Sequence, residues 1–293
     1  MMAMLNRIVL SGRIKGSPSS PTMRLLIFAA LAMLLATPAG AQLITAHRGA
    51  SHDAPENTLA AFRLAWEQQA DAIEGDFRLS SDGRIVCVHD ADTKRIAGVN
   101  HVVAATPLAE LRALDAGSWK DPRFADERLP TFAEVLATVP EGKRFFIELK
   151  TGPEIVPAIV HELQGRRGDP ALLSIIAFDA ATIAASKRAL PAIRAHWLTS
   201  FKQDKAGGAW LPNAETIAAT VEACGADGVG MAGKREVIDR DFVNRLRSLG
   251  VREFHVWTVD APDDARFFRD LGAMGITTNR PAFIRAALAA PAR

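Results

Sequence analysis

Cysteine is scarce in this sequence, and neither sign of charge dominates. Only 2 of the 293 residues are cysteine, so at most one internal disulfide can form, which excludes a small disulfide-rich scaffold. Lys and Arg total 35 against 33 Asp and Glu, and no long basic run occurs, which argues against a nucleic-acid-binding protein. The 48% apolar and 23% charged residues are ordinary values for a globular protein and exclude disorder, collagen and a coiled coil.

Long apolar runs are missing as well. The run near the N-terminus covers only residues 25–36, whereas a helix needs about 20 residues to cross a bilayer. The segment before it is basic and contains no acid: Arg7, Arg13, Lys15 and Arg24. The small-residue triplet Ala39-Gly40-Ala41 follows, and this order is typical of a secretory signal peptide. We therefore expect residues 1–41 to be cleaved before Gln42, with Met1 or Met23 as the start, and the remaining chain to be periplasmic or secreted without a stable membrane anchor.

From residue 43 onward, short apolar runs alternate with stretches of helical periodicity. Eight runs have the composition of strands: 43–47, 72–79, 144–150, 172–178, 193–199, 228–232, 253–259 and 275–279. The segments between them repeat apolar residues with a period near 3.6, as amphipathic helices do. Eight strand–helix repeats without a linker predict an α/β fold, a single (β/α)₈ TIM-barrel domain over residues 42–293.

The ends of the predicted helices carry capping residues. Asn57, Asp179 and Asp260 stand at expected N-caps, and Gly250 and Gly272 stand where helices are expected to end.

One segment departs from the strand–helix alternation. Ser80-Ser-Asp-Gly83 is a turn sequence that joins residues 73–79 to a strand-like run at 85–89, which predicts a hairpin after the second strand. The stretch 90–130 is loop-rich, with one short helix expected at 108–114. We expect this hairpin-and-loop insertion to form part of the active-site rim. Cys87 in the hairpin and Cys224 near a helix end are expected to be buried thiols, with a disulfide as the alternative.

Carboxylates gather at the ends of the predicted strands, where a TIM barrel carries its active site. Glu74 and Asp76 are two residues apart in one strand and therefore share a face, as do Glu148 and Lys150 in the next. Three converging carboxylates would repel one another unless a cation lies between them. Oxygen ligands favour Mg²⁺ or Ca²⁺ over zinc, and the zinc motifs H-E-x-x-H and C-x-x-C are missing.

Cationic and titratable side chains lie beside these carboxylates. Arg48 and Lys150 add the positive charge that a bound phosphate requires. His47 and His89 can exchange protons near neutral pH. A single acid or histidine at a strand end is more commonly a capping, surface or structural residue, so the prediction depends on several motifs on successive strand ends.

The sequence resembles the glycerophosphodiester phosphodiesterase family over nearly all of residues 43–290. The matching motifs follow in the family's order and spacing: Ala46-His-Arg-Gly49, Pro55-Glu-Asn-Thr58, Glu74-x-Asp76, Ser81-Asp-Gly83, Val88-His-Asp90, Leu129-Pro-Thr131, Ile147-Glu-Leu-Lys150, Val256-Trp-Thr-Val259 and Thr277-Thr-Asn-Arg-Pro281. Asn279 and Ala177 depart from it, since the family commonly has Asp and Ser there. We interpret both as affecting the fit of the substrate more than the chemistry.

The resemblance implies a TIM-barrel enzyme that hydrolyses glycerophosphodiesters to an alcohol and sn-glycerol 3-phosphate. It implies one divalent cation, Mg²⁺ or Ca²⁺, held by Glu74, Asp76 and Glu148. The glycerol 2-hydroxyl would attack the phosphorus, and water would open the resulting cyclic phosphate. The other implied roles are acid–base catalysis by His47 and His89, phosphate binding by Arg48 and Lys150, support by Glu56, and contact of Trp257 and Phe178 with the glycerol or leaving group.

Two alternatives remain open at this stage. The first is a related phosphodiesterase acting on lysophospholipids or another bulky phosphodiester, because the rim formed by residues 90–130 and 200–213 sets the size of the leaving group. The second is a non-catalytic exported protein that binds phosphate esters. In each case the partner is a small molecule. The sequence does not select between Mg²⁺ and Ca²⁺, between the two histidines as acid and base, or among oligomeric states.

Overall fold

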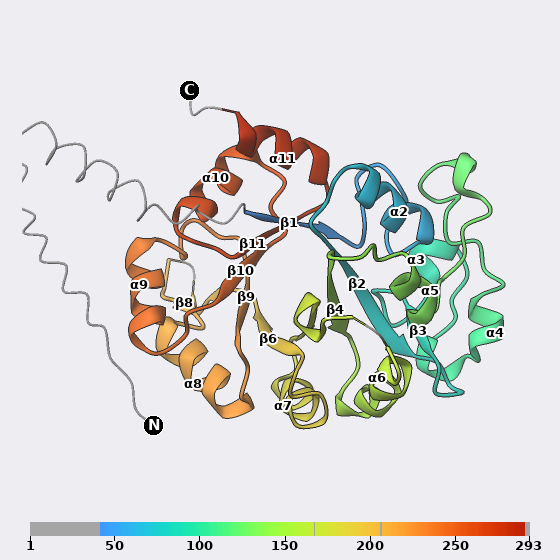
Figure 1. The fold of residues 1–293 in the computed structure, drawn as a ribbon, viewed down its shortest axis with the longest axis horizontal. Helices are drawn as coiled ribbons and strands as arrows, with labels where there is room; N and C mark the ends of the chain where they lie inside the picture. The colour runs from blue at the N-terminus through green and yellow to red at the C-terminus, as the bar shows by residue number, and fades with distance from the viewer. Residues whose placement is uncertain (1–41, 167, 206, 291–293) are drawn as a thin grey trace, which may run out of the picture. The chain divides into compact units, whose positions relative to one another are not determined.

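The computed structural model describes residues 42–166, 168–205 and 207–290. The predicted signal peptide, residues 1–41, lies outside these ranges. In Figure 1 the strands of the described part form the centre and the helices surround them. No helix within the described ranges is long and apolar enough to cross a membrane.

Parallel strands form a closed barrel. Its eight strands are β1 (Leu43–His47), β2 (Ala72–Leu79), β4 (Arg144–Leu149), β5 (Leu173–Ala177), β6 (Arg194–Thr199), β9 (Gly228–Ala232), β10 (Phe254–Trp257) and β11 (Gly275–Thr278). Each pairs with the next in parallel, and β1 pairs with both β2 and β11, which closes the sheet. The (β/α)₈ prediction is therefore confirmed. All eight predicted runs are strands, with ends that differ by a residue or two.

The main helices follow the strands. They are α2 (Leu59–Glu67), α5 (Phe132–Ala137), α6 (Val156–Leu163), α7 (Ala180–Ala189), α8 (Ala214–Cys224), α9 (Arg240–Ser248), α10 (Pro262–Asp270) and α11 (Pro281–Ala289). Apolar side chains of strands and helices fill the layer between them, as in the contacts of Phe77 with Phe132 and Phe145. Inside the barrel a small apolar layer, Ala72, Phe146, Ile176 and Leu198, lies among the inward-facing residues.

The predicted helix ends are correct in three of five cases. Asp179 caps α7 by accepting from Ala181 N and Thr182 N, and Gly250 and Gly272 follow α9 and α10 with positive φ. The prediction that Asn57 and Asp260 are N-caps was wrong. The side chain that caps α2 is Thr58, and α10 begins after Ala261 without a side-chain cap. Both predicted caps turn their side chains toward other strand ends instead.

The insertion after β2 packs around its own small core. Strand β3 (Ile85–Cys87) pairs antiparallel with β2, as predicted. The helices α3 (Lys94–Ala97) and α4 (Leu108–Leu111) follow, so the predicted helix at 108–114 ends early and α3 was missed. Their apolar side chains form a separate cluster that includes Val86, Leu111 and Leu129. In Figure 1 this insertion lies beside α2 and α5.

A short hairpin lies outside the barrel's strand–helix repeats. It consists of β7 (Lys202–Gln203) and β8 (Trp210–Leu211) and lies in the segment expected to form part of the rim. Its two-residue strands are too short for any periodicity to indicate them.

Both cysteines are free and buried in the described structure, which confirms the prediction of two buried thiols.

Candidate active site

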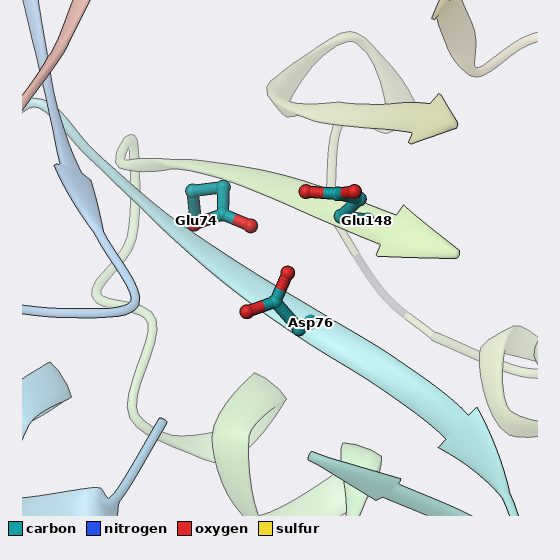
Figure 2. Close-up of side chains that lie close together, drawn as sticks. All are labelled: Glu74, Asp76 and Glu148. Atoms are coloured by element: carbon teal, nitrogen blue, oxygen red, sulfur yellow. The ribbon is translucent and has the colours of Figure 1, made fainter. Parts of the chain in front are cut away.

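Parallel pairing places the predicted site residues at the same end of the barrel. His47 at the end of β1 is in register with Glu74 of β2, and Asp76 of β2 is in register with Glu148 of β4. The carboxylates of Glu74, Asp76 and Glu148 lie close together, with one oxygen of each within 4.8 Å of the others. Figure 2 shows the three side chains converging from the two strands. All three are buried.

This carboxylate triad fits a divalent cation. Glu74 Oε1 is buried and has no hydrogen-bond partner among the described residues. A buried carboxylate oxygen without a partner is costly, and a hard cation with oxygen ligands would satisfy it. Burial and the charges of Asp76 and Glu148 raise the pKa of Glu74 well above its usual value, and burial with Asp76 raises that of Glu148. The donor set is all oxygen, which suits Mg²⁺ or Ca²⁺.

Two cationic side chains flank the triad. Lys150 Nζ lies 3.1 Å from Asp76 Oδ1 and also pairs with Glu148, while Arg48 Nε lies 3.1 Å from Asp76 Oδ2. Burial raises the pKa of Asp76, but Lys150 and Arg48 outweigh it and hold the pKa well below its usual value. The site therefore keeps at least one ionised carboxylate, with positive charge beside it for an anionic ligand.

Arg48 is held by both its backbone and its side chain. Its φ of 55° lies in the left-handed region, and its backbone N–H donates to Glu74 Oε2 at 2.9 Å. Its Nη1 donates to Glu56 Oε1 at 2.9 Å. A non-glycine residue in this conformation is uncommon, and the carboxylates of Glu56, Glu74 and Asp76 account for it here.

His47 lies half-buried beside the triad. Its Nδ1 is 2.8 Å from Asn279 Oδ1, at the end of β11. Burial and the charge of Arg48 lower the pKa of His47 to about 4, against the opposing effects of Asp76 and Asn279. The ring is therefore neutral near pH 7.

His89 follows β3 in the insertion and faces the same cavity. Its Nδ1 is 2.7 Å from Asp90 Oδ1. Burial lowers the pKa of His89, with Lys150 and Arg48 adding to the effect and Asp76 and Asp90 opposing it. His47 is thus oriented by the amide of Asn279, and His89 by the carboxylate of Asp90.

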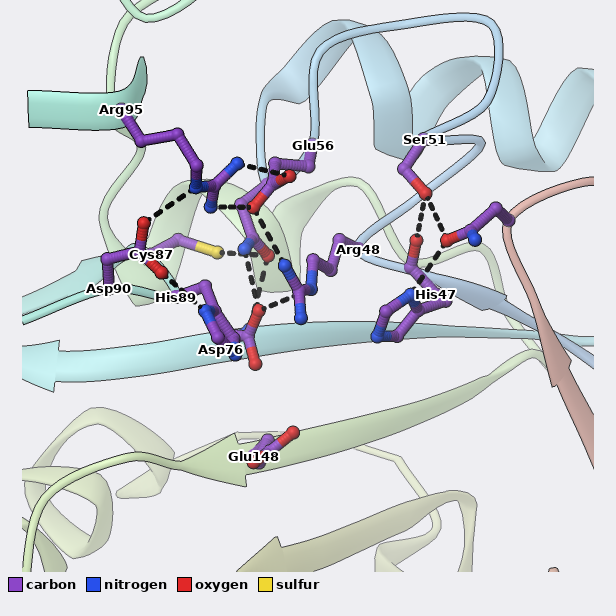
Figure 3. Close-up of polar contacts among 12 residues, drawn as sticks. His47, Arg48, Ser51, Glu56, Asp76, Cys87, His89, Asp90, Arg95 and Glu148 are labelled. Atoms are coloured by element: carbon purple, nitrogen blue, oxygen red, sulfur yellow. Dashed lines mark hydrogen bonds and ion pairs between the residues drawn. The ribbon is translucent and has the colours of Figure 1, made fainter. Parts of the chain in front are cut away.

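Sequence analysis missed Arg95, which joins these groups from α3 of the insertion. Its Nε donates to Asp90 Oδ2 at 2.7 Å, and its two Nη atoms donate to the Glu56 carboxylate at 2.9 and 2.7 Å. Figure 3 shows the resulting chain from His89 through Asp90, Arg95 and Glu56 to Arg48. No motif marked Arg95, because only the folding of the insertion brings α3 against the turn that holds Glu56.

Most of the predicted residues line one cavity of about 110 Å³. Its lining residues are His47, Arg48, Glu74, His89, Glu148, Lys150, Ile176, Phe178, Leu198, His255, Trp257 and Thr277. One wall is charged, and the opposite wall is largely apolar. Phe178 and Trp257 meet edge to face on the apolar side, with ring centroids 5.5 Å apart. His255 of β10 also lines the cavity.

The two departures from the family pattern differ in where they lie. Asn279 hydrogen-bonds the ring of His47, one of the two predicted acid–base residues. Ala177 is fully buried in the apolar layer between barrel and helices and does not line the cavity. The reason is strand alternation: Ile176 and Phe178 face the cavity, and Ala177 between them faces the other way.

Comparisons with known proteins identify relatives of this chain. A model of the glycerophosphoryl diester phosphodiesterase family matches residues 47–283. A glycerophosphodiester phosphodiesterase of Bacillus subtilis is 27% identical over 256 residues, which cover 82% of this chain and 84% of that protein. One of Caldanaerobacter subterraneus is 42% identical over 124 residues, covering 41% of this chain and only 50% of that relative. An Oleispira antarctica phosphodiesterase, solved in complex with the product sn-glycerol-3-phosphate, has a TM-score of 0.74 and 26% identity, covering 85% of this chain and 97% of that one.

Proposed function

The chain belongs to the glycerophosphoryl diester phosphodiesterase family, and on that premise we propose that it hydrolyses glycerophosphodiesters to an alcohol and sn-glycerol 3-phosphate. The observation that carries the proposal is a cavity lined by two carboxylates of the buried triad, two cationic side chains and two histidines, with the third carboxylate, Asp76, beside them. The family, the related enzymes and the product bound to the structural relative support the substrate class.

Glu74, Asp76 and Glu148 are proposed to hold one divalent cation, Mg²⁺ or Ca²⁺. When bound, this ion supplies positive charge that stabilises the phosphate in the transition state. Arg48 and Lys150 lie beside the triad and are proposed to bind the phosphate oxygens. Glu56 supports Arg48, and Trp257 with Phe178 would contact the glycerol or the leaving group.

The two histidines are proposed to divide acid and base catalysis. Both rings use Nδ1 for a contact within the protein, which leaves Nε2 of each for the substrate. His47 has a neutral partner and a lowered pKa, so it suits the base that takes the proton from the glycerol 2-hydroxyl as that oxygen bonds to phosphorus. The pKa of His89 is lowered as well, but the carboxylate of Asp90 beside it opposes this effect and stabilises the protonated ring, so His89 suits the acid that protonates the departing alcohol. Water would then open the cyclic phosphate with the two roles reversed.

Leaving-group chemistry tests this division. Glycerophosphocholine needs a proton on its departing alcohol, whereas the 4-nitrophenyl ester of glycerol 3-phosphate releases a stable phenolate. We expect His47→Ala to lower kcat about 10²- to 10⁴-fold on both substrates. His89→Ala should lose as much on glycerophosphocholine and recover most activity on the nitrophenyl ester. Recovery in His47→Ala instead would reverse the assignment, and near-normal activity of both variants on glycerophosphocholine would refute the pair.

Metal removal tests the remaining part of the proposal. Activity should disappear in EDTA and return on addition of Mg²⁺ or Ca²⁺. An assay of lysophosphatidylcholine beside glycerophosphocholine distinguishes the alternative with a bulky substrate. Binding of glycerophosphocholine without release of sn-glycerol 3-phosphate, with either ion present, would favour the non-catalytic alternative.

The chain is further proposed to be exported, with residues 1–41 as its signal peptide. Support comes from the composition of that segment, which places four basic residues before a short apolar run and an A-x-A site.

A further inference from the structure

The side chain that holds His47 is itself held by a second side chain. Asn279 Oδ1 contacts His47 Nδ1 at 2.8 Å, and Asn279 Nδ2 donates to Asp260 Oδ2 at 2.6 Å. Asp260 is anchored in turn, because its Oδ1 accepts from Thr278 Oγ1 at 2.7 Å and from the backbone N–H of Asn279 at 2.8 Å. These contacts connect the segment after β10, the end of β11 and the end of β1.

This arrangement determines which way the amide of Asn279 faces. The Asp260 carboxylate can only accept hydrogen bonds, so the NH₂ group of Asn279 must point toward it. The amide oxygen then faces the ring of His47. Ser51 Oγ lies 2.8 Å from that oxygen and 2.7 Å from the backbone oxygen of His47, so its single proton is shared between these two acceptors. With the amide reversed, its oxygen would lie 2.6 Å from a carboxylate oxygen, which is repulsive.

The orientation of the amide in turn determines the proton position on His47. An amide oxygen only accepts, so the contact to Nδ1 is a hydrogen bond only when Nδ1 carries the proton. A neutral ring has one proton, which leaves Nε2 as a free acceptor. The backbone of β1 and the contact at Nδ1 direct Nε2 away from Asn279.

We propose that Asn279 and Asp260 are positioning residues that hold neutral His47 in its Nδ1–H tautomer and so keep Nε2 available to accept a proton. The inference rests on the proposed function, since it assigns the reason why His47 can act as the base. It also accounts for asparagine at position 279. A carboxylate there would face the carboxylate of Asp260, whereas an amide can donate to Asp260 and accept from His47 at the same time.

The contacts from Asp260 through Asn279 to His47, here called the relay, predict that a specific double variant recovers activity. Asn279→Leu removes both contacts at similar volume and should lower kcat about 10- to 100-fold with little change in KM, as for other residues that orient a functional histidine. Asp260→Asn should lower kcat as well. The new side chain can donate as well as accept, so it no longer requires the NH₂ group of Asn279 to point toward it. The double variant Asn279→Asp/Asp260→Asn restores the chain of donors and acceptors, with the carboxylate now next to His47, and should recover most of the lost activity.

A spectroscopic readout separates this inference from the activity. In the full chain labelled with ¹⁵N at histidine, two-bond ¹H–¹⁵N correlations distinguish the Nδ1–H from the Nε2–H tautomer, and His47→Gln assigns the ring. We expect Nδ1–H in the wild-type protein, in Ser51→Ala and in the double variant, and a mixture or Nε2–H in Asn279→Leu and Asp260→Asn. Nε2–H in the wild-type protein, or Nδ1–H retained in both single variants, would overturn the relay. An active His47→Ala enzyme would refute the proposed base while the tautomer result stands by itself.

Discussion

At the scale of single residues, the balance of charge in the cavity depends on Glu74. Its carboxylate is buried next to two other carboxylates, and one of its oxygens has no hydrogen-bond partner in the described part of the chain. We therefore expect this carboxylate to destabilise the metal-free protein and to help bind the proposed cation.

Glu74→Gln tests both effects at once. Without metal we expect the variant to be at least as stable as the wild-type protein, because an amide removes the buried repulsion and can still accept from Arg48 N–H. With saturating Mg²⁺ or Ca²⁺, the wild-type protein should gain about 2.7 kcal/mol at a hundredfold excess over Kd, and the variant should gain much less. Thermal unfolding with and without each ion measures this. The exposed Glu110→Gln serves as control, and an undiminished metal effect in Glu74→Gln would contradict the ligand set.

His255 is a second residue whose environment has a measurable consequence. Its ring lies in the barrel with centroids 5.4 Å from those of Phe146 and His196, and neither of its nitrogens has a hydrogen-bond partner within the described ranges. A Cβ at Gly230 would lie 2.4 Å from its Nε2, so glycine there makes the room for the ring. Burial, with a smaller contribution from the charge of His196, lowers the pKa of His255 well below its usual value.

A lowered pKa in the folded state predicts acid lability. As the pH falls below about 6.5, the unfolded chain binds a proton at His255 and the folded protein does not, so the free energy of unfolding decreases. His47, with a folded-state pKa of about 4, adds a similar decrease between pH 6.5 and 4. We expect His255→Gln to reduce the slope of stability against pH by up to about 1.4 kcal/mol per unit, measured by urea unfolding between pH 7 and 5. The exposed His161→Gln should leave the slope unchanged, and an equal slope in both variants would show that His255 does not contribute.

At the scale of elements, the insertion after β2 carries one histidine of the proposed acid–base pair and also the residues that hold it in place. His89 follows β3, and Arg95 on the short α3 fixes Asp90 behind it while also contacting Glu56. A four-residue helix has little stability of its own, so its position depends on the small apolar cluster of the insertion.

Arg95→Leu tests whether α3 acts on catalysis. Since Arg95 is 44% exposed, we expect the free energy of unfolding to change by less than about 1 kcal/mol. We expect kcat/KM to fall about tenfold, because Asp90 and Glu56 lose their shared partner, and Arg95→Lys to recover part of the loss. Arg112→Leu is the matched control, since Arg112 lies in the same insertion and forms a two-pronged pair with Glu134 of α5 away from the cavity. Equal losses of activity in both variants would indicate a general effect on the insertion.

At the scale of the whole molecule, the proposed removal of a signal peptide would change the net charge of the chain. The formal charge of +2 includes four basic residues of the proposed signal peptide and no acid from it. Without them the charge is slightly negative, and residues 42–293 match the about 250 residues typical of one TIM barrel.

N-terminal sequencing of the protein exported by a bacterial host tests this proposal. We expect the mature chain to begin at Gln42, because signal peptidase requires small residues at positions 39 and 41. Ala41→Phe should block the cleavage and leave the precursor in the cell fraction, whereas Gln42→Asn should be cleaved normally. Uncleaved full-length protein in the exported fraction would contradict the proposal.

The sequence by itself determined the barrel and the residue types of its site. Apolar periodicity is local, so it marks the eight strands and their helices, and the two-residue spacing places Glu74 and Asp76 on one face.

Composition and spacing could not show which side chains contact those residues. Asn57 and Asp260 stand where helices begin, which suggested caps, yet Asn57 Nδ2 donates to Asp76 and Asp260 holds Asn279. His47 and Asn279 are 232 positions apart, and only closure of the barrel between β1 and β11 brings them together. Local patterns therefore fixed which elements form, while the contacts that orient the catalytic groups depend on where distant strand ends meet, and only the tertiary structure decides that.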